Sequence, residues 1–305
     1  MIQITDRLLS LPDMSRCAGA ALRRLYRLLL ETGVAKVEVS AAVREKLGGA
    51  VVPERTALRL SEGEIADGGA RIAELRFDSA AEFPSGARFP AGESCRITGL
   101  DDLLLYDYPQ VFGRLRCYAD AVEFCPGDRR GFATALALEW LERGGERLAV
   151  SFLGAGGFAP LEEVLVGRHV TAGARRGAPE GNASFAVLRE LKRAYEEATG
   201  EAVPPHKPVV GDRIFWVESG IHVDGILKNP ANYEPFPPEL LGMTHTVTLG
   251  THSGRGSIRH ALRERGLEAD EGAVGALLRQ VQDASARLGR GLTDAEFDML
   301  RAGSL

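Results

Sequence analysis

The sequence predicts an α/β fold in its first half, as a parallel sheet or barrel, and a linker with a helical end in its second half. Short β-like runs alternate with helical runs up to about residue 153. After a further helix, residues 203–256 are dense in Pro and Gly and read as a loop. Strand–helix–strand order with short connections favours parallel pairing.

Seven apolar, partly alternating runs predict strands, whereas residues 48–100 are rich in Gly, Pro and Ala and predict no clean helix. The expected strands are Ile2–Ile4, Val34–Val39, Thr56–Leu60, Ile72–Phe77, Cys95–Thr98, Ala121–Phe124 and Leu148–Leu153.

Helical spacing of apolar residues predicts helices over residues 18–32, 131–143 and 184–198, each followed closely by glycine. In the tail, Val274, Leu277, Leu278, Val281 and Leu288 recur at the same spacing. The run Thr293-Asp-Ala-Glu296 is a capping box that predicts a last short helix.

Composition argues against nucleic-acid-binding, membrane and secreted proteins. A net charge of −5 over 305 residues argues against a general binder of nucleic acid or anionic membranes. No stretch approaches the roughly 20 apolar residues that span a bilayer, and the N-terminal residues show no secretion signal. We therefore expect a cytoplasmic protein with no nucleic-acid or membrane partner.

The histidines are unevenly distributed. All six lie in the second half of the chain: His169, His206, His222, His245, His252 and His260. A site in the first 168 residues therefore has no imidazole of its own. The four cysteines are widely spaced without a CxxC pair, which is typical of free buried thiols.

Residues 218–242, ESGIHVDGILKNPANYEPFPPELLG, place His222 in a short apolar run, with Tyr233 eleven positions later and Glu218 nearby. By chemistry alone this is a weak acid/base signal, because a lone histidine beside apolar residues is more often a satisfied core residue.

The same string resembles the linker region of the homocitrate synthase and 2-isopropylmalate synthase family, particularly the nitrogen-fixation type of homocitrate synthase, in a divergent or omega-like form. The flanking runs 204–211 (PPHKPVVG) and 249–255 (LGTHSGR) agree, as does the run 159–164 (APLEEV). The resemblance extends from about residue 121 to the C-terminus.

This resemblance implies a TIM barrel followed by two small subdomains, usually as a homodimer, and a Claisen condensation of acetyl-CoA with a 2-oxo acid at a divalent metal. It also implies that His222 is an acid/base residue and Tyr233 a donor to the developing oxyanion, both reaching into the partner's barrel. Glu218 completes the set of candidate catalytic residues.

The barrel half departs from the family pattern at every metal-ligand position. Where the resemblance implies a metal-binding Asp, an H-x-H pair and an Asn, this chain has Leu11, Cys125, Gly127 and Ser151. A divalent metal needs several oxygen or imidazole ligands at fixed distances. We therefore expect no metal cofactor in this chain, unless Asp13, Asp128 and Glu123 rebuild a site.

The barrel is also short. About 115 residues separate the first strand from the H-x-H position, whereas eight strand–helix units need about 250. We therefore expect a reduced or degenerate barrel over residues 1–170, a helix and linker subdomain over 171–256 and a helical C-terminal subdomain over 257–305.

Three functions remain open. The chain is a synthase subunit that donates His222 and Tyr233 in trans to an intact paralogue, a self-sufficient acyltransferase with a rebuilt or metal-free site, or a non-catalytic interaction paralogue. The first implies a hetero-oligomer, although a homodimer fits the family equally well.

Overall fold

The computed structural model describes residues 2–84, 86, 88–176 and 184–303, and it divides the chain into two compact units, Met1–Val210 and Gly211–Leu305. The three-part division expected at residues 170 and 256 stays a prediction. In the part of the chain that the structure describes, no helix is long and apolar enough to cross a membrane.

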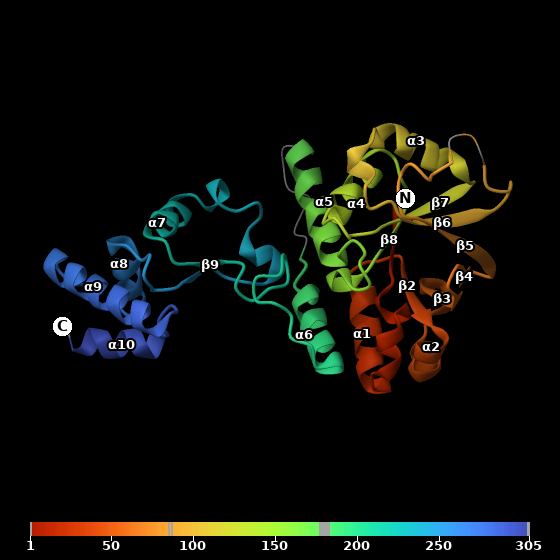
Figure 1. Ribbon diagram of the computed structural model, residues 1–305. Coiled ribbons are helices and arrows are strands. Elements are labelled where there is room, and N and C mark those ends of the chain that lie inside the picture. The colour runs from red at the N-terminus through yellow and green to blue at the C-terminus, as the bar shows by residue number, and fades with distance from the viewer. Residues whose placement is uncertain (1, 85, 87, 177–183, 304–305) are drawn as a thin grey trace. The chain divides into compact units, whose positions relative to one another are not determined.

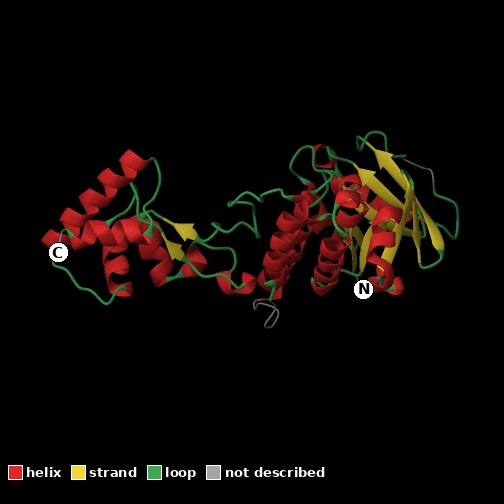
Figure 2. Cartoon of the chain, turned by 90° about the horizontal axis from the view of Figure 1, so that it is seen from below, coloured by secondary structure: helices red, strands yellow, loops and turns green. Residues whose placement is uncertain are grey.

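The first unit is a closed barrel, so the expected TIM-barrel-like fold is confirmed (Figures 1 and 2). Its strands, in their order around the barrel, are β1 (Gln3–Asp6), β2 (Lys36–Ser40), β3 (Thr56–Ser61), β4 (Glu64–Asp67), β5 (Ala70–Phe77), β6 (Ser94–Gly99), β7 (Ala121–Pro126) and β8 (Arg147–Val150).

Helices accompany only part of this barrel. They are α1 (Gly19–Glu31), α2 (Ala41–Leu47), α3 (Tyr108–Tyr118), α4 (Ala133–Glu142), α5 (Leu161–Arg176) and α6 (Val187–Thr199). The helices predicted over 18–32, 131–143 and 184–198 are therefore confirmed as α1, α4 and α6. Among the described residues from Thr56 to Gly99 there is no helix.

The barrel is reduced at β4, which the strand predictions missed. This strand runs antiparallel to both β3 and β5, whereas the other pairs are parallel. Two-residue turns join it to its neighbours, and the turn before β5 is Gly68-Gly69 with φ of 58° and 87°. Positive φ at both central positions defines a hairpin turn whose twist matches that of the flanking strands. A hairpin thus replaces the helical connections of a full barrel.

The second unit has its own elements. They are β9 (Trp216–Val217), α7 (Gly220–Lys228), β10 (Thr246–Val247), α8 (Arg255–Glu264), α9 (Glu271–Leu288) and α10 (Asp294–Ala302). Strands β9 and β10 pair in parallel. The prediction of a loop throughout 203–256 was wrong at α7, where the burial of Val223 and Ile226 stabilises a short helix despite two glycines.

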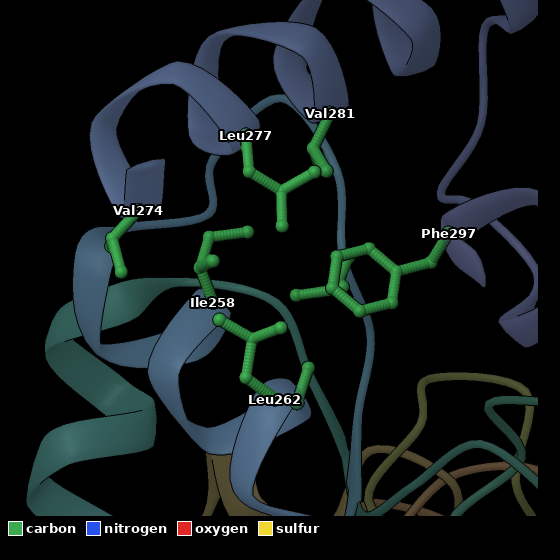
Figure 3. Packing of buried hydrophobic residues seen from close by; sticks show 8 residues of the cluster. Ile258, Leu262, Val274, Leu277, Val281 and Phe297 are labelled. Carbon is green, nitrogen blue, oxygen red and sulfur yellow. The ribbon is translucent and has the colours of Figure 1, made fainter. Parts of the chain in front are cut away.

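The helical end packs around its own apolar core. Ile258 and Leu262 from α8 face Val274, Leu277 and Val281 from α9 (Figure 3). Phe297 of α10 closes this core, with 1% of its surface exposed. The predicted capping box holds the start of α10, since Thr293 and Glu296 cap each other's backbone N–H. The expected helical C-terminal part is confirmed.

Candidate functional site

His222 and Tyr233 lie together in the second unit. His222 is on α7, and Tyr233 directly follows a short 3-10 helix, Pro230–Asn232. Their ring centroids are 5.6 Å apart in an edge-to-face arrangement, and both side chains are exposed. An exposed imidazole and an exposed phenol thus lie side by side.

A glycine makes this arrangement possible. A Cβ built on Gly225 of α7 would lie 2.3 Å from the Tyr233 ring, so the ring occupies the space that any side chain there would need. At the start of α7, a Cβ on Gly220 would lie 2.8 Å from the Cα of Gly254. Gly220 and Gly225 therefore serve close packing, rather than a turn.

Glu218 has a different environment from the other two candidate residues. Its carboxylate accepts a hydrogen bond from the backbone N–H of His252 at 2.8 Å and lies where a side chain at Gly250 would be. Among the described residues, no hydrogen bond or ion pair joins Glu218 to His222 or Tyr233. In this geometry Glu218 holds the 250–252 loop, and its catalytic role stays a prediction.

One pair in this region carried no sequence signal. The Nε2 of His245 lies 2.7 Å from each carboxylate oxygen of Glu234, the residue after Tyr233. The imidazole also contacts Phe215 edge to face, at 6.1 Å between centroids. The pair fastens the Tyr233 segment beside β10.

In the barrel, the two positions where the resemblance implies metal-binding histidines, Cys125 and Gly127, are closely packed. Cys125 is fully buried, and Arg7 Nη1 donates a hydrogen bond to its Sγ at 3.0 Å. Burial raises the pKa of the Cys125 thiol, which favours the neutral form that binds metals poorly. At Gly127, a Cβ would lie 2.3 Å from a carboxylate oxygen of Asp101, which Arg129 holds through its backbone N–H and its Nε.

Leu11 and Ser151 offer no better donors. Leu11 is apolar and contacts the 154–157 loop, since a Cβ on Gly156 would lie 2.9 Å from its side chain. Ser151 is fully buried and its hydroxyl has no partner among the described residues. A leucine, a neutral thiol, a glycine and one hydroxyl do not fit a divalent metal site.

The carboxylates proposed to rebuild a site point to three different places. Asp13 is exposed and pairs with Arg16 at 3.2 Å. Asp128 accepts a hydrogen bond from the backbone of Ala133 at the start of α4. Glu123 accepts one from Arg96 inside the barrel. Within the described ranges, no three His, Cys, Asp or Glu residues are grouped to hold a metal ion.

Inside the barrel, Arg7, Arg59 and Arg96 interleave with three glutamates from different strands. Arg96 of β6 is 1% exposed and binds Glu38 of β2 at 2.5 Å, Glu74 of β5 at 3.1 Å and Glu123 of β7 at 2.7 Å. Arg59 of β3 bridges the same Glu38 and Glu74, at 2.7 and 2.8 Å. These ion pairs form one network, which is buried at Arg7, Arg96 and Glu38 and partly buried at the other residues.

The pKa values follow from this arrangement. Burial alone would raise the pKa of Glu38, but Arg96, Arg7 and Arg59 lower it to about 2. Asp6 and Glu162 have only partial compensation, and burial raises the pKa of each to about 7. The backbone N–H groups of Leu8 and Phe152 donate to Asp6, so this carboxyl holds the carboxyl ends of β1 and β8 together.

The chain is thus a reduced α/β barrel followed by a separate unit that carries an exposed His–Tyr pair. Comparison with known proteins shows what these parts are similar to. The family described as homocitrate synthase post-HMGL domain-like matches residues 209–288.

Relatives match more of the chain. The omega subunit of homocitrate synthase from Clostridium pasteurianum is 32% identical over 176 residues, 58% of this chain and 48% of the relative. Homocitrate synthase from Frankia sp. is 37% identical over 210 residues, 66% of this chain and 50% of the relative. A probable 2-isopropylmalate synthase from Ignicoccus hospitalis is 36% identical over 50% of this chain and 38% of its own length.

Over these regions the chain is similar to the homocitrate synthase and 2-isopropylmalate synthase family. It spans about half the length, or less, of the curated relatives it matches.

Proposed function

We propose that this chain is a subunit for a homocitrate synthase-type condensation of acetyl-CoA with a 2-oxo acid. Its second unit supplies His222 and Tyr233 in trans to the barrel of an intact paralogue. The observation that carries the proposal is the contrast between an exposed, close-packed His–Tyr pair and a barrel whose metal-ligand positions are filled.

The chemistry needs two groups at one place. Forming the enolate of an acetyl thioester moves a proton from its methyl group, and an imidazole is suited to this near neutral pH. The negative charge that develops on the thioester oxygen is stabilised by a hydrogen-bond donor, and the Tyr233 hydroxyl is such a donor. With 46% of its surface exposed, Tyr233 is available to a second chain.

The partner and setting belong to the same proposal. The relative from Clostridium pasteurianum is named as an omega subunit, which supports a hetero-oligomer over a homodimer. The absence of a metal cofactor from this chain, its cytoplasmic location and a place in nitrogen fixation stay predictions.

The test is reconstitution with an intact paralogue, measured as release of coenzyme A from acetyl-CoA and the 2-oxo acid that the paralogue accepts. His222→Ala should lower the activity of the mixture by about 10²–10⁴-fold, the usual contribution of an acid/base group. The fold and the pairing should persist, because the imidazole is exposed. His206→Ala removes an equally exposed imidazole from the first unit and is the matched control.

Each alternative gives a different result. Full activity of the mixture with His222→Ala would refute the donated-residue role. Equal activity of this chain without a partner would support the self-sufficient acyltransferase. Stable pairing that leaves the paralogue's rate unchanged would support the non-catalytic interaction paralogue.

A further inference from the structure

We propose that the interior of this barrel is a sealed ionic core, in which the guanidinium of Arg7 is the fixed cation in place of the family's divalent metal. The inference deepens the proposed function, because a sealed barrel leaves only the second unit to take part in catalysis. This inference uses the family resemblance only to locate the position of the metal.

The position of Arg7 is the first step. The residue directly follows β1, and its side chain reaches Cys125, the first of the two histidine positions, with Nη1 3.0 Å from Sγ. On its other side, the guanidinium carbon lies 4.1 Å from the centre of the Phe158 ring. Phe158 in turn pairs through its backbone with Gly127, the second histidine position. The guanidinium thus lies among the residues that replaced the metal ligands.

Charge balance is the second step. Arg7 Nη2 lies 3.3 Å from Glu74, and its Nε lies 3.9 Å from Glu38. Together with Arg59 and Arg96, it gives three cations against the three carboxylates Glu38, Glu74 and Glu123. A divalent cation added to this balanced set would bring two uncompensated charges into a buried site, which is strongly unfavourable.

Closure of the site is the third step. Arg7 is 4% exposed, Glu38 and Cys125 are not exposed, and the Phe158 ring covers the guanidinium. In TIM barrels the interior is a packed core, and substrates bind at the carboxyl ends of the strands. Here Arg7 and Phe158 occupy the space beside Cys125 and Gly127, where the metal and the 2-oxo acid would lie.

Thiol accessibility tests the seal without any substitution inside the barrel. Cys117 is exposed, whereas Cys17, Cys95 and Cys125 are buried. With Cys117→Ser as the background, the native chain should react with an aromatic disulfide reagent roughly 100-fold more slowly than the wild type, since the remaining thiols need local opening. A rapidly reacting Cys125, identified by mass spectrometry, would overturn the sealed core.

Manganese binding tests the fixed cation. The wild-type chain alone should leave added Mn²⁺ free at millimolar concentration in electron paramagnetic resonance. One tightly bound Mn²⁺ that is lost in Cys125→Ser would overturn the proposal.

Arg7→Met keeps the length of the side chain and removes its charge. The melting temperature should fall by roughly 10 °C, since Glu38 and Glu74 lose a buried partner. Arg16→Met, at an arginine whose side chain is 83% exposed, should leave it unchanged. A melting temperature of Arg7→Met equal to that of the wild type would refute the role of Arg7. If Arg7→Met does not fold, the thiol and manganese measurements on the wild-type background still decide.

None of these measurements includes a partner chain or a condensation assay. Their failure therefore leaves the donated-residue role to its own test, and failure of reconstitution leaves the ionic core intact.

Discussion

The two units of this chain differ in the space that their functional candidates leave for a ligand. In the barrel, Arg7, Asp101 and Phe158 fill the space beside Cys125 and Gly127, where the family resemblance implies metal ligands. In the second unit, Gly225 still accommodates the ring of Tyr233 beside His222. The comparison teaches that ion pairs between strands can fill a closed barrel, whereas an exposed ring pair depends on close packing beneath it.

Breaking the barrel network should have the largest effect on stability. Arg96→Met would leave Glu38, Glu74 and Glu123 without their shared cation, and we expect the free energy of unfolding to fall by about 3–5 kcal/mol. Urea denaturation followed by tryptophan fluorescence measures this, because Trp140 is buried in the first unit. Arg76→Met, at a 63% exposed arginine, is the control. A change below 1 kcal/mol would contradict a stabilising network.

The pH dependence of stability should also reveal the buried carboxyl groups of the barrel unit. Asp6 and Glu162 keep a proton in the folded state up to about pH 7 but lose it near pH 4 when unfolded. Their stabilising effect is therefore complete below about pH 4 and is lost as the pH rises to 7. Glu38, with a folded pKa of about 2, loses its effect as the pH falls below its ordinary value of 4.5.

We therefore expect the melting temperature to be highest near pH 4–5 and to fall towards neutral pH, by an amount equivalent to a few kcal/mol. Calorimetry from pH 3 to pH 8 measures the profile. Glu162→Gln removes one of the titrating groups and should flatten the neutral side. A melting temperature that rises steadily from pH 5 to pH 7 would rule out the raised pKa values.

The packing around Tyr233 gives a third, smaller prediction. Gly225→Ala introduces a Cβ where the ring lies, so the ring must move away from His222. We expect the activity of the reconstituted pair to fall about 10-fold to 100-fold through loss of the oxyanion donor. Gly256→Ala on α8, which has no neighbour within 4 Å, should preserve activity. A nuclear Overhauser contact between the two rings that survives Gly225→Ala would contradict the steric argument.

The smallest expected effect is at Asp13. Its side chain is 84% exposed and pairs only with an exposed arginine among the described residues. Asp13→Ala should therefore change the free energy of unfolding by no more than about 0.5 kcal/mol. It should leave the metal content of the purified chain unchanged, as measured by elemental analysis. Loss of a bound metal would instead show that Asp13 rebuilds a site.

The sequence by itself determined the local features of this protein. Helices α1, α4 and α6 follow from apolar spacing, and the start of α10 follows from Thr293 and Glu296, because such signals act within a few residues. That Cys125 and Gly127 lack the donors of a metal-binding histidine pair also follows from the residues alone. The Gly68-Gly69 pair between alternating runs was a hairpin signal that could have revealed β4.

Only the tertiary structure decided what depends on distant residues. Glu38 and Arg96 are 58 positions apart, and nothing in either neighbourhood indicates that barrel closure brings them to 2.5 Å. Helix α7 has two glycines and weak propensity, so packing of Val223 and Ile226 had to supply its stability. From the sequence, Glu218 is an acidic residue near His222. In the structure it binds the 250–252 loop, because His252 lies beside it although it is 34 positions away in the sequence. Long-range contacts place these side chains, and their partners are not encoded in any local pattern.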